Sequence, residues 1–366
     1  MSGAGVTGPI SIVKWLRSSS VMIGEVRCAY ENLGDILVHR AIERLMKGIR
    51  IITYDDSDRA LRWLVSRKLF RFGMLGGGTL IFSPRNVGWL GSLESLLART
   101  EPLCTFGTGV VDPEFVAGVY EAAGRRSPVN EESLQAWTAL LRRFPIVGVR
   151  GVESARILRE RGVVDVDVVG DPAVAFARDE VRPKVRRKRI GLNVLSESHF
   201  WPGSKERALK EMDRFARDLV SDGWEVHLMP ACAKDLALAI EFADAVGRDK
   251  IRLCSVYDDV DVYMANMGAL DLFVGMRLHS YVVACCMHTP GLVVGYQPKC
   301  LDFAKTIGLE RYHIATHEVA ADRLMAEVRD LYSALEMVQN EVAAKCSAMK
   351  QGLEAFAGRV AARLTS

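Results

Sequence analysis

The chain has 366 residues, 49% hydrophobic and 25% charged, a composition typical of globular proteins and a length more easily divided into two cores than packed into one. Its 48 basic and 45 acidic residues give a formal charge of +3, which is too balanced for a nucleic-acid-binding surface, so we expect no nucleic-acid partner. The longest apolar stretches fall well short of the roughly 20 residues that span a bilayer, so we expect no membrane span.

Short runs of β-branched and apolar residues alternate with helical patterns in the first half of the chain, which is typical of parallel α/β construction. Strands are predicted at residues 21–27, 49–54, 70–75, 103–106, 146–149 and 166–169. Helical stripes lie between them, including residues 35–46 and 152–161. We therefore predict an N-terminal α/β domain over residues 1–180.

A basic, proline-broken stretch follows at residues 178–189 and has no amphipathic period. Charge runs of this kind are usually solvated connectors, so we predict a linker at residues 181–189. Contact of this run with a nucleic acid or an acidic lipid is the less favoured alternative.

The α/β scheme then restarts, with strands predicted at residues 190–195, 224–229, 251–253, 270–274 and 292–294. Helices are predicted at residues 205–221, 235–246 and 259–267, and another after Arg277. We predict a C-terminal α/β domain over residues 190–318 and a helical tail over 319–366, interrupted near Gly352 and Gly358. The expected fold class is α/β, with two doubly wound Rossmann-like domains that face a cleft.

Ligands of open α/β sheets bind beyond the carboxyl ends of the strands, so the loops after the first-half strands are candidates for a site. Asn32 and Asp35 flank Gly34 ahead of the first helix; capping of that helix is the favoured role for either polar residue alone, and Gly34 would let a ligand approach.

Glycine-rich segments follow two further strands of the first half. Gly77 and Gly78, and likewise Gly107 and Gly109, expose backbone amides that could hold an anion. No Gly-Lys-Ser/Thr sequence follows the triple glycine at residues 76–78, so this is not a P-loop.

Charged side chains occupy three other strand ends. Arg150 lies where a strand gives way to a helix and can face the cleft, with an exposed salt bridge as the alternative. Asp171 precedes a proline, which favours a structural role in a turn. Glu197 and His199 follow the first strand of the second domain and could contact an acceptor, although surface loops have the same composition.

Arg277 and His279 stand two residues apart at a predicted strand-to-helix junction. A guanidinium at this place can hold a phosphate or a carboxylate, and an imidazole can exchange a proton near neutral pH. The simpler alternative is that Arg277 pairs with a nearby acid and His279 caps the helix.

The remaining polar residues indicate neither a metal site nor a disulfide framework. The seven histidines are scattered, and His317-Glu318 lacks the second histidine of a zincin, so we expect no metal ion. The eight cysteines form no Cys-x-x-Cys pair, and the adjacent Cys285 and Cys286 are expected to be buried thiols. Charged residues at 14 and 17 interrupt any signal-peptide core. We expect a cytoplasmic protein that works in solution or at the inner face of the membrane.

Taken together, these segments resemble the polysaccharide pyruvyltransferase family. The likeness extends from about residue 32 to residue 309 and is most specific in the Arg-Leu-His segment with the small-residue helix and glycines 291 and 295 that follow it. It also includes the Asn-x-Gly-Asp segment, both glycine-rich segments, Val149-Arg150 with Ser154, and Gly170-Asp171-Pro172.

The resemblance implies a fold like that of the two-domain GT-B glycosyltransferases. It also implies transfer of the enolpyruvyl carbons of phosphoenolpyruvate to two sugar hydroxyls as a ketal, with phosphate released and no cofactor. Arg150 and Arg277 match the family's donor-binding positions, and His279 matches the position of the acid. The expected substrate-binding residues are Asn32, Asp35, Gly77, Gly78, Gly107, Gly109, Leu278, Ser280 and Glu197, with the acceptor on the N-terminal domain and the donor on the C-terminal domain.

Two alternatives stay open at this point. A GT-B glycosyltransferase that uses a nucleotide sugar would also need the glycine-rich loops and the cleft, and a non-catalytic sugar-binding or assembly protein would keep the fold. The expected partners are a small-molecule donor and a saccharide acceptor, free or lipid-linked. The oligomeric state is open.

Overall fold

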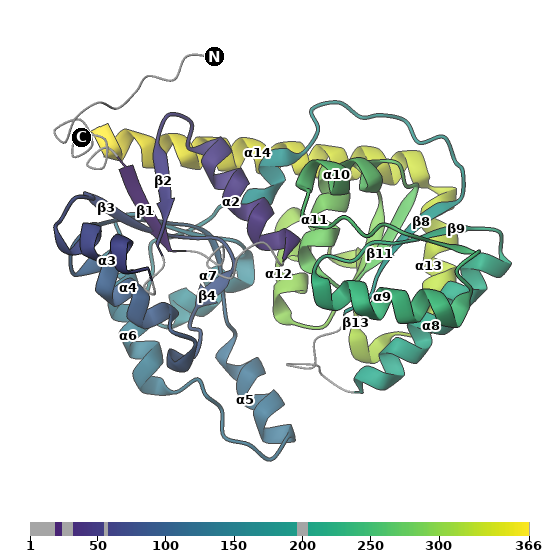
Figure 1. Ribbon diagram of the computed structural model, residues 1–366, viewed down its shortest axis with the longest axis horizontal. Helices are drawn as coiled ribbons and strands as arrows, with labels where there is room; N and C mark the ends of the chain where they lie inside the picture. The colour runs from purple at the N-terminus through teal and green to yellow at the C-terminus, as the bar shows by residue number, and fades with distance from the viewer. Residues whose placement is uncertain (1–18, 24–31, 55–57, 196–203, 366) are drawn as a thin grey trace.

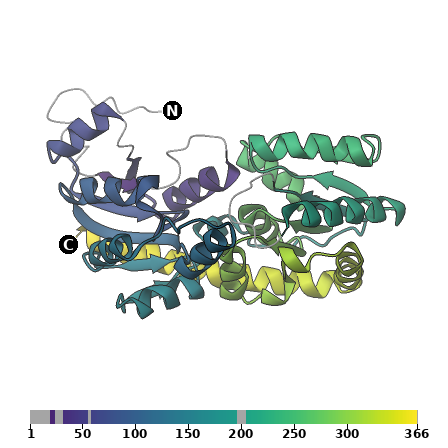
Figure 2. The ribbon, with the colours of Figure 1, turned by 90° about the horizontal axis from the view of Figure 1, so that it is seen from below.

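Two parallel sheets with helices packed on their faces form the framework of the protein. The structure is a computed structural model that describes residues 19–23, 32–54, 58–195 and 204–365. Figures 1 and 2 show the two sheets side by side, the first in purple to teal and the second in teal to yellow-green. The long helix near the C-terminus runs along both.

The first sheet is seven-stranded, in the order β2-β1-β3-β5-β6-β7, with β4 paired to β5. Its strands are β1 (Ser19–Ile23), β2 (Arg50–Thr53), β3 (Phe72–Gly76), β4 (Thr79–Ile81), β5 (Glu101–Val110), β6 (Val147–Val149) and β7 (Val166–Val168). Its helices are α2 (Leu33–Leu45), α3 (Arg59–Ser66), α4 (Trp89–Leu97), α5 (Pro113–Ala122), α6 (Glu131–Leu141) and α7 (Val152–Glu160), with short 3-10 turns η2 (Arg85–Val87) and η3 (Pro172–Phe176).

The second sheet is six-stranded, in the order β10-β9-β8-β11-β12-β13, so the strand order reverses between β8 and β11. Its strands are β8 (Arg189–Asn193), β9 (Glu225–Leu228), β10 (Ile251–Leu253), β11 (Leu272–Gly275), β12 (Gly291–Gly295) and β13 (His313–Ala315). The helices are α8 (Lys205–Ser221), α9 (Ala233–Val246), α10 (Val260–Gly268), α11 (Leu278–Cys286) and α12 (Pro298–Ile307), with turns η4 (Glu310–Tyr312) and η5 (Thr316–Glu318). A reversal of this kind is where doubly wound sheets bind ligands.

Most predicted strands and helices are confirmed to within a few residues, because apolar periodicity is a local signal. Residues 24–27 of the first predicted strand lie outside the described residues. The short strands β4 and β13 were not predicted. The glycine-rich segment at 107–109 is not a loop: it belongs to β5, whose pairing with β6 shifts register between Thr105 and Thr108.

The predicted interruption of the C-terminal helix is wrong. Helix α13 (Ala321–Ser333) and helix α14 (Leu335–Thr365) meet at Ala334, and α14 continues through both glycines. A glycine in a helix costs only about 1 kcal/mol relative to alanine, and burial of Phe356 and its neighbours outweighs that cost. Phe356 packs edge-to-face on Phe106 of β5, with ring centroids 5.0 Å apart, so α14 ends against the first sheet.

The segment between η3 and β8 is held more firmly than a solvated connector. The Lys184 ammonium donates to the carbonyl of Gly268 at 3.0 Å and to Thr289 Oγ1 at 2.9 Å, and the backbone N–H of Arg187 donates to Asp271. Burial lowers the pKa of Lys184 to about 8. The two domains also share one continuous apolar core, to which α2, η3, α11 and α14 contribute.

The structure bears on the predictions about the cysteines and about membrane-spanning segments. Cys285 and Cys286 are buried free thiols, as predicted. None of the helices within the described ranges is both long and apolar enough to cross a membrane.

Candidate functional site

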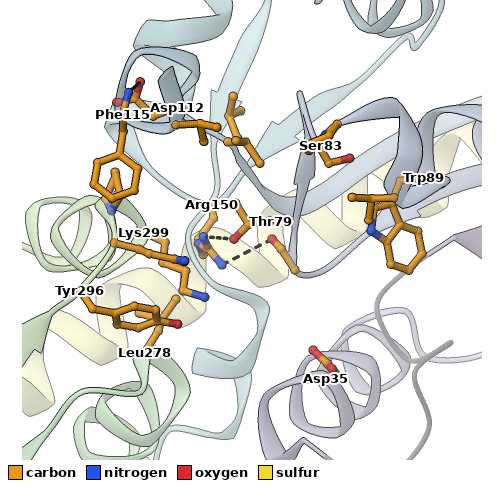
Figure 3. A pocket seen from close by; sticks show the side chains of 18 of the residues that line it. Asp35, Thr79, Ser83, Trp89, Asp112, Phe115, Arg150, Leu278, Tyr296 and Lys299 are labelled. Carbon is orange, nitrogen blue, oxygen red and sulfur yellow. Dashed lines mark hydrogen bonds between the residues drawn. The ribbon is translucent and has the colours of Figure 1, made fainter. Parts of the chain in front are cut away.

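A cavity of about 460 Å³ lies between the two domains, at the carboxyl ends of strands from both sheets. A pocket of this size between domains is typical of small-molecule sites. Seven of the residues predicted from the sequence line it: Asn32, Asp35, Gly78, Arg150, Arg277, Leu278 and His279. The structure therefore brings residues at the end of β6 and at the starts of α2 and α11 around one space (Figure 3).

Arg150 lies at the centre of the cavity wall, directly after β6, and only 2% of it is exposed. The alternative of an exposed salt bridge is therefore wrong. Its guanidinium donates to Thr79 Oγ1 at 2.8 Å and to the carbonyl of Gly78 at 3.4 Å. The φ angle of Gly78 is +60°, a left-handed conformation that favours glycine, so the chain can turn here and aim its carbonyl at Arg150.

Asp171 stands between Arg150 and His279. Its Oδ2 lies 4.0 Å from Arg150 Nη1 and 3.5 Å from His279 Nε2, and the residue is fully buried. Burial by itself raises the pKa of Asp171, but a charged His279 and Arg150 outweigh burial and hold that pKa below its usual value. The predicted structural role is also confirmed, because Asp171 accepts from the Ala173 N–H at the start of η3.

Three polar atoms of this cluster lack a hydrogen-bond partner among the described residues: Arg150 Nε, Asp171 Oδ2 and His279 Nε2. Buried polar atoms without partners cost free energy, and they are frequent where a protein binds a ligand. Asp171 Oδ2 and His279 Nε2 face each other at 3.5 Å, so the donor of this cluster without a partner among the described residues is Arg150 Nε.

The His279 ring lies directly against the backbone of Gly34, in the first turn of α2. A Cβ atom at position 34 would overlap the imidazole at Nδ1, Cγ and Cε1. Asn32 caps the same helix by accepting the Gly34 N–H at 2.9 Å, as predicted from its residue type. The Asn-x-Gly-Asp segment thus provides both a helix start and the space that His279 occupies.

The Arg277 side chain forms an ion pair with an acidic residue. Its guanidinium makes a bidentate pair with Asp235 at 2.8 and 2.9 Å and also contacts Cys232, so pairing with an acid is confirmed. Its backbone N–H donates to Asn193 Oδ1 at the end of β8, across the point where the strand order reverses. Arg277 still lines the cavity, held in one orientation by these contacts.

Arg277 is also the N-cap residue of α11, which starts at Leu278 without a side-chain cap. The alternative in which His279 caps the helix is therefore wrong. An uncapped helix N-terminus directs backbone N–H groups and a partial positive charge toward whatever lies ahead of it. At α11 that space is the cavity lined by Leu278 and His279.

The other predicted site residues lie elsewhere. Gly77, Gly107, Gly109 and Ser280 line neither this cavity nor its neighbour. Gly107 and Gly109 give room to Pro172 and to the Arg150 guanidinium, respectively. Ser280 is buried in the second domain, where it accepts from the Tyr263 hydroxyl at 2.9 Å. Glu197 lies outside the described residues.

Several lining residues were not predicted from the sequence. Lys299 enters from the first turn of α12, with its ammonium 5.2 Å from the centre of the Tyr296 ring. Trp89 and Phe115, together with several valines, line the cavity from the first domain, and Figure 3 shows Phe115 on the same side as Lys299 and Trp89 on the far side. A strand-end Gly-Tyr ahead of a proline-started helix at 295–298 is the only local sign of this part of the site.

A second cavity of about 430 Å³ continues from the first between α5 and α12. The two share seven lining residues, among them Asp112, Phe115, Tyr296 and Lys299. Among the described residues, no group of three or more His, Cys, Asp or Glu side chains could hold a metal ion. The expectation that the protein uses no metal remains a prediction.

Solved structures with the same two-domain arrangement cover most of the chain. A Listeria monocytogenes protein assigned as a UDP-N-acetylglucosamine 2-epimerase matches with a TM-score of 0.58 and 11% identity over 89% of this chain and 91% of its own. An MnaA–UDP structure from S. aureus has a TM-score of 0.55 and 11% identity, covering 89% and 90%. The wall teichoic acid polymerase TagF has a TM-score of 0.54 and 9% identity, covering 97% and 93%.

These neighbours confirm the predicted fold, α/β with two Rossmann-like domains in a GT-B-like arrangement. At these identities the likeness shows the fold alone. No curated protein matches the chain in sequence.

A family model places the chain more specifically. The model for polysaccharide pyruvyl transferases matches residues 32–298, which include Asn32, Arg150, Asp171, Arg277 and His279. The matched region starts at the helix that holds His279 in place and ends at the start of α12. The chain therefore belongs to the polysaccharide pyruvyl transferase family.

Proposed function

We propose that the protein transfers the enolpyruvyl group of phosphoenolpyruvate to a saccharide, forms a pyruvate ketal and releases phosphate. The observation that carries this proposal is the cluster in which Arg150 of one domain and His279 of the other flank the buried Asp171 at the cavity wall. It combines a fixed cation with a proton donor that has its own counter-ion.

The cationic part of the cavity suits a donor that carries both a carboxylate and a phosphate. Arg150, Lys299 and the N-terminus of α11 approach the space from different elements. Guanidinium groups and helix N-termini are frequent binding partners of phosphate and carboxylate. Arg277 lines the same space in a fixed orientation, with its charge balanced by the bidentate pair with Asp235.

His279 would act first as the acid. Transfer of its proton to the methylene carbon of phosphoenolpyruvate makes a methyl group and leaves positive charge at C2, to which a sugar hydroxyl adds. The C2–O bond to phosphate then breaks, and a second hydroxyl of the same acceptor adds at C2 to close the ketal. One of the two hydroxyl protons returns to His279, and the other leaves with the phosphate. Asp171 would stabilise the imidazolium at the start of each turnover.

The acceptor would lie against the first domain. The cavity wall there includes Trp89, Phe115 and Tyr120, and the second cavity extends this wall toward α12. Aromatic rings offer apolar faces on which the C–H side of a sugar ring can stack. Asp35 and Asp112 add carboxylates that can accept hydrogen bonds from sugar hydroxyls.

The same apolar wall favours the second candidate function, transfer of a glycosyl group from a nucleotide sugar, because an aromatic wall can also stack on a base. The two donors differ in size and charge, so they can be distinguished by binding.

The test is calorimetric titration and thermal unfolding with phosphoenolpyruvate and with a panel of nucleotide sugars. Phosphoenolpyruvate at about 100 times its Kd should stabilise the fold by about 2.7 kcal/mol. A diol-bearing saccharide panel would follow, with phosphate release and the new ketal methyl signal in proton NMR as readouts. Stabilisation by a nucleotide sugar and none by millimolar phosphoenolpyruvate would favour glycosyl transfer instead.

A further inference from the structure

Helix α7 of the first domain starts against helix α12 of the second. The backbone N–H of Val152 donates to Thr306 Oγ1 at 3.0 Å, and the backbone N–H of Glu153 donates to Asp302 Oδ1 at 2.8 Å. The first-turn N–H groups of α7, which need acceptors, therefore find them on the opposite domain. No side chain of the first domain caps this helix within the described residues.

Both carboxylate oxygens of Asp302 accept hydrogen bonds from α7. Its second carboxylate oxygen accepts from the Ser154 hydroxyl at 2.7 Å, and only 3% of the residue is exposed. Gly151 provides the space for it, since a Cβ atom at 151 would overlap the carboxylate. The φ angle of Gly151 is −145°, which any residue adopts, so the glycine is required here for space and not for its backbone freedom.

These contacts connect both sides of the cavity. Arg150 immediately precedes Gly151, and Lys299 lies on the same helix as Asp302, one turn earlier. Ser154 also accepts the backbone N–H of Val110 at 3.2 Å, at the end of the strand that leads to α5. Each of Arg150, Lys299 and the start of α5 is therefore within a few residues of the Asp302 contact.

We propose that Asp302 is a positioning residue. It holds Arg150 of the first domain at a fixed position relative to Lys299 and His279 of the second domain before any ligand binds. The part of this inference that concerns donor binding rests on the proposed function. The hydrogen bonds that a buried carboxylate accepts from a backbone N–H and a hydroxyl are stronger than an exposed ion pair, and they fix the two segments more rigidly. The exposed pair between Glu153 and Lys305 across the same contact, at 2.6 Å, would contribute little.

The first experiment needs no donor. Hydrogen exchange is measured on the ligand-free protein and on Asp302→Ala, with Asp58→Ala as the matched control. Asp58 also accepts two first-turn N–H groups, but of α3 and within one domain. We expect the amides of residues 150–154 to exchange at least about tenfold faster in Asp302→Ala and not in Asp58→Ala. Unchanged exchange in a folded Asp302→Ala protein would refute the proposed role.

The second experiment measures the affinity for phosphoenolpyruvate by calorimetry. Asp302→Ala should weaken it by about tenfold or more, since displacement of Arg150 by a fraction of an ångström is costly, while Asp58→Ala should not change it. Asp302→Asn keeps the oxygen that accepts the Glu153 N–H, so it should recover part of the affinity. Equal affinities in all variants would refute the positioning of Arg150. If the wild-type protein binds no phosphoenolpyruvate, the proposed function fails, and the exchange experiment still decides whether Asp302 holds the segment.

Discussion

A single methyl group added at position 34 should separate activity from stability. Gly34 is the second residue of α2, and its φ angle is not among the positive ones, so the backbone accepts alanine. In a helix, alanine is favoured over glycine by about 1 kcal/mol. On helix propensity alone, Gly34→Ala would therefore stabilise the protein.

The position of His279 leads us to expect that Gly34→Ala lowers activity. The new Cβ atom would overlap three ring atoms, so the imidazole must move by more than about 1 Å, and a displacement of this size would cost about 10²-fold in rate if His279 is the proposed acid. The side chain is only 15% exposed and has little room to move. Overpacking costs about 1 to 3 kcal/mol, which the helix gain partly offsets, so the net loss of stability should stay near 1 kcal/mol.

Phosphate release at saturating donor and acceptor would report the rate, and thermal unfolding would report the stability. Gly352→Ala on α14 is the matched control, because nothing lies within 4 Å of the Cβ atom that it would add. It should raise the melting temperature slightly and leave the rate unchanged. If Gly34→Ala folds and works at the wild-type rate, His279 does not need the position that the structure gives it, and the proposed role of this residue as the acid fails.

Three further substitutions test the cluster around Asp171. His279→Gln should keep most of the donor affinity but lose about 10²- to 10⁴-fold in turnover, measured as phosphate release, because glutamine cannot supply a proton; a folded variant near the wild-type rate would exclude histidine as the acid. Arg150→Ala should weaken phosphoenolpyruvate binding by about 1.5 to 3 kcal/mol in calorimetry, whereas Arg187→Ala, which removes an exposed side chain, should change little, and equal affinities would remove Arg150 from the donor site. Asp171→Asn should destabilise the protein by about 3 to 5 kcal/mol at neutral pH. The lowered pKa of the native Asp171 carboxyl contributes stability above the ordinary value of about 4, so the difference in melting temperature should shrink as the pH falls below that value; a constant difference would refute the charge assignment.

Arg277 needs a different design, because its substitution changes more than donor binding. Removing the guanidinium would leave Asp235, which is fully buried, without its bidentate partner. Such a loss destabilises by several kcal/mol and would obscure any effect on the donor. Arg150 is therefore the clearer test of the cationic part of the site.

The sequence alone was sufficient to predict the two α/β domains and the strand ends at which Arg150, Arg277 and His279 lie. These predictions depend on apolar periodicity and on residue types at the ends of strands, which are properties of short segments. The resemblance carried by the same segments identified the family, which the family model confirms over residues 32–298.

The tertiary structure decided which residues meet. A structural role was the favoured prediction for Asp171, and its contact with His279 joins residues 108 positions apart in the chain, between one domain and the other. Lys299 and Asp235 carry no local pattern that marks them, and they reach the site through the arrangement of α12 and α9.

Packing between distant segments explains both the continuity of α14 and the contact that Asp302 makes. Glycines at 352 and 358 suggest a break when only propensity is considered, but burial of Leu353 and Phe356 against other elements outweighs their cost. The capping of α7 by a carboxylate 148 residues from Ser154 depends on the docking of two domains. Local sequence determines which segments become strands and helices, whereas the partners of buried charges are chosen by packing between segments distant in the chain.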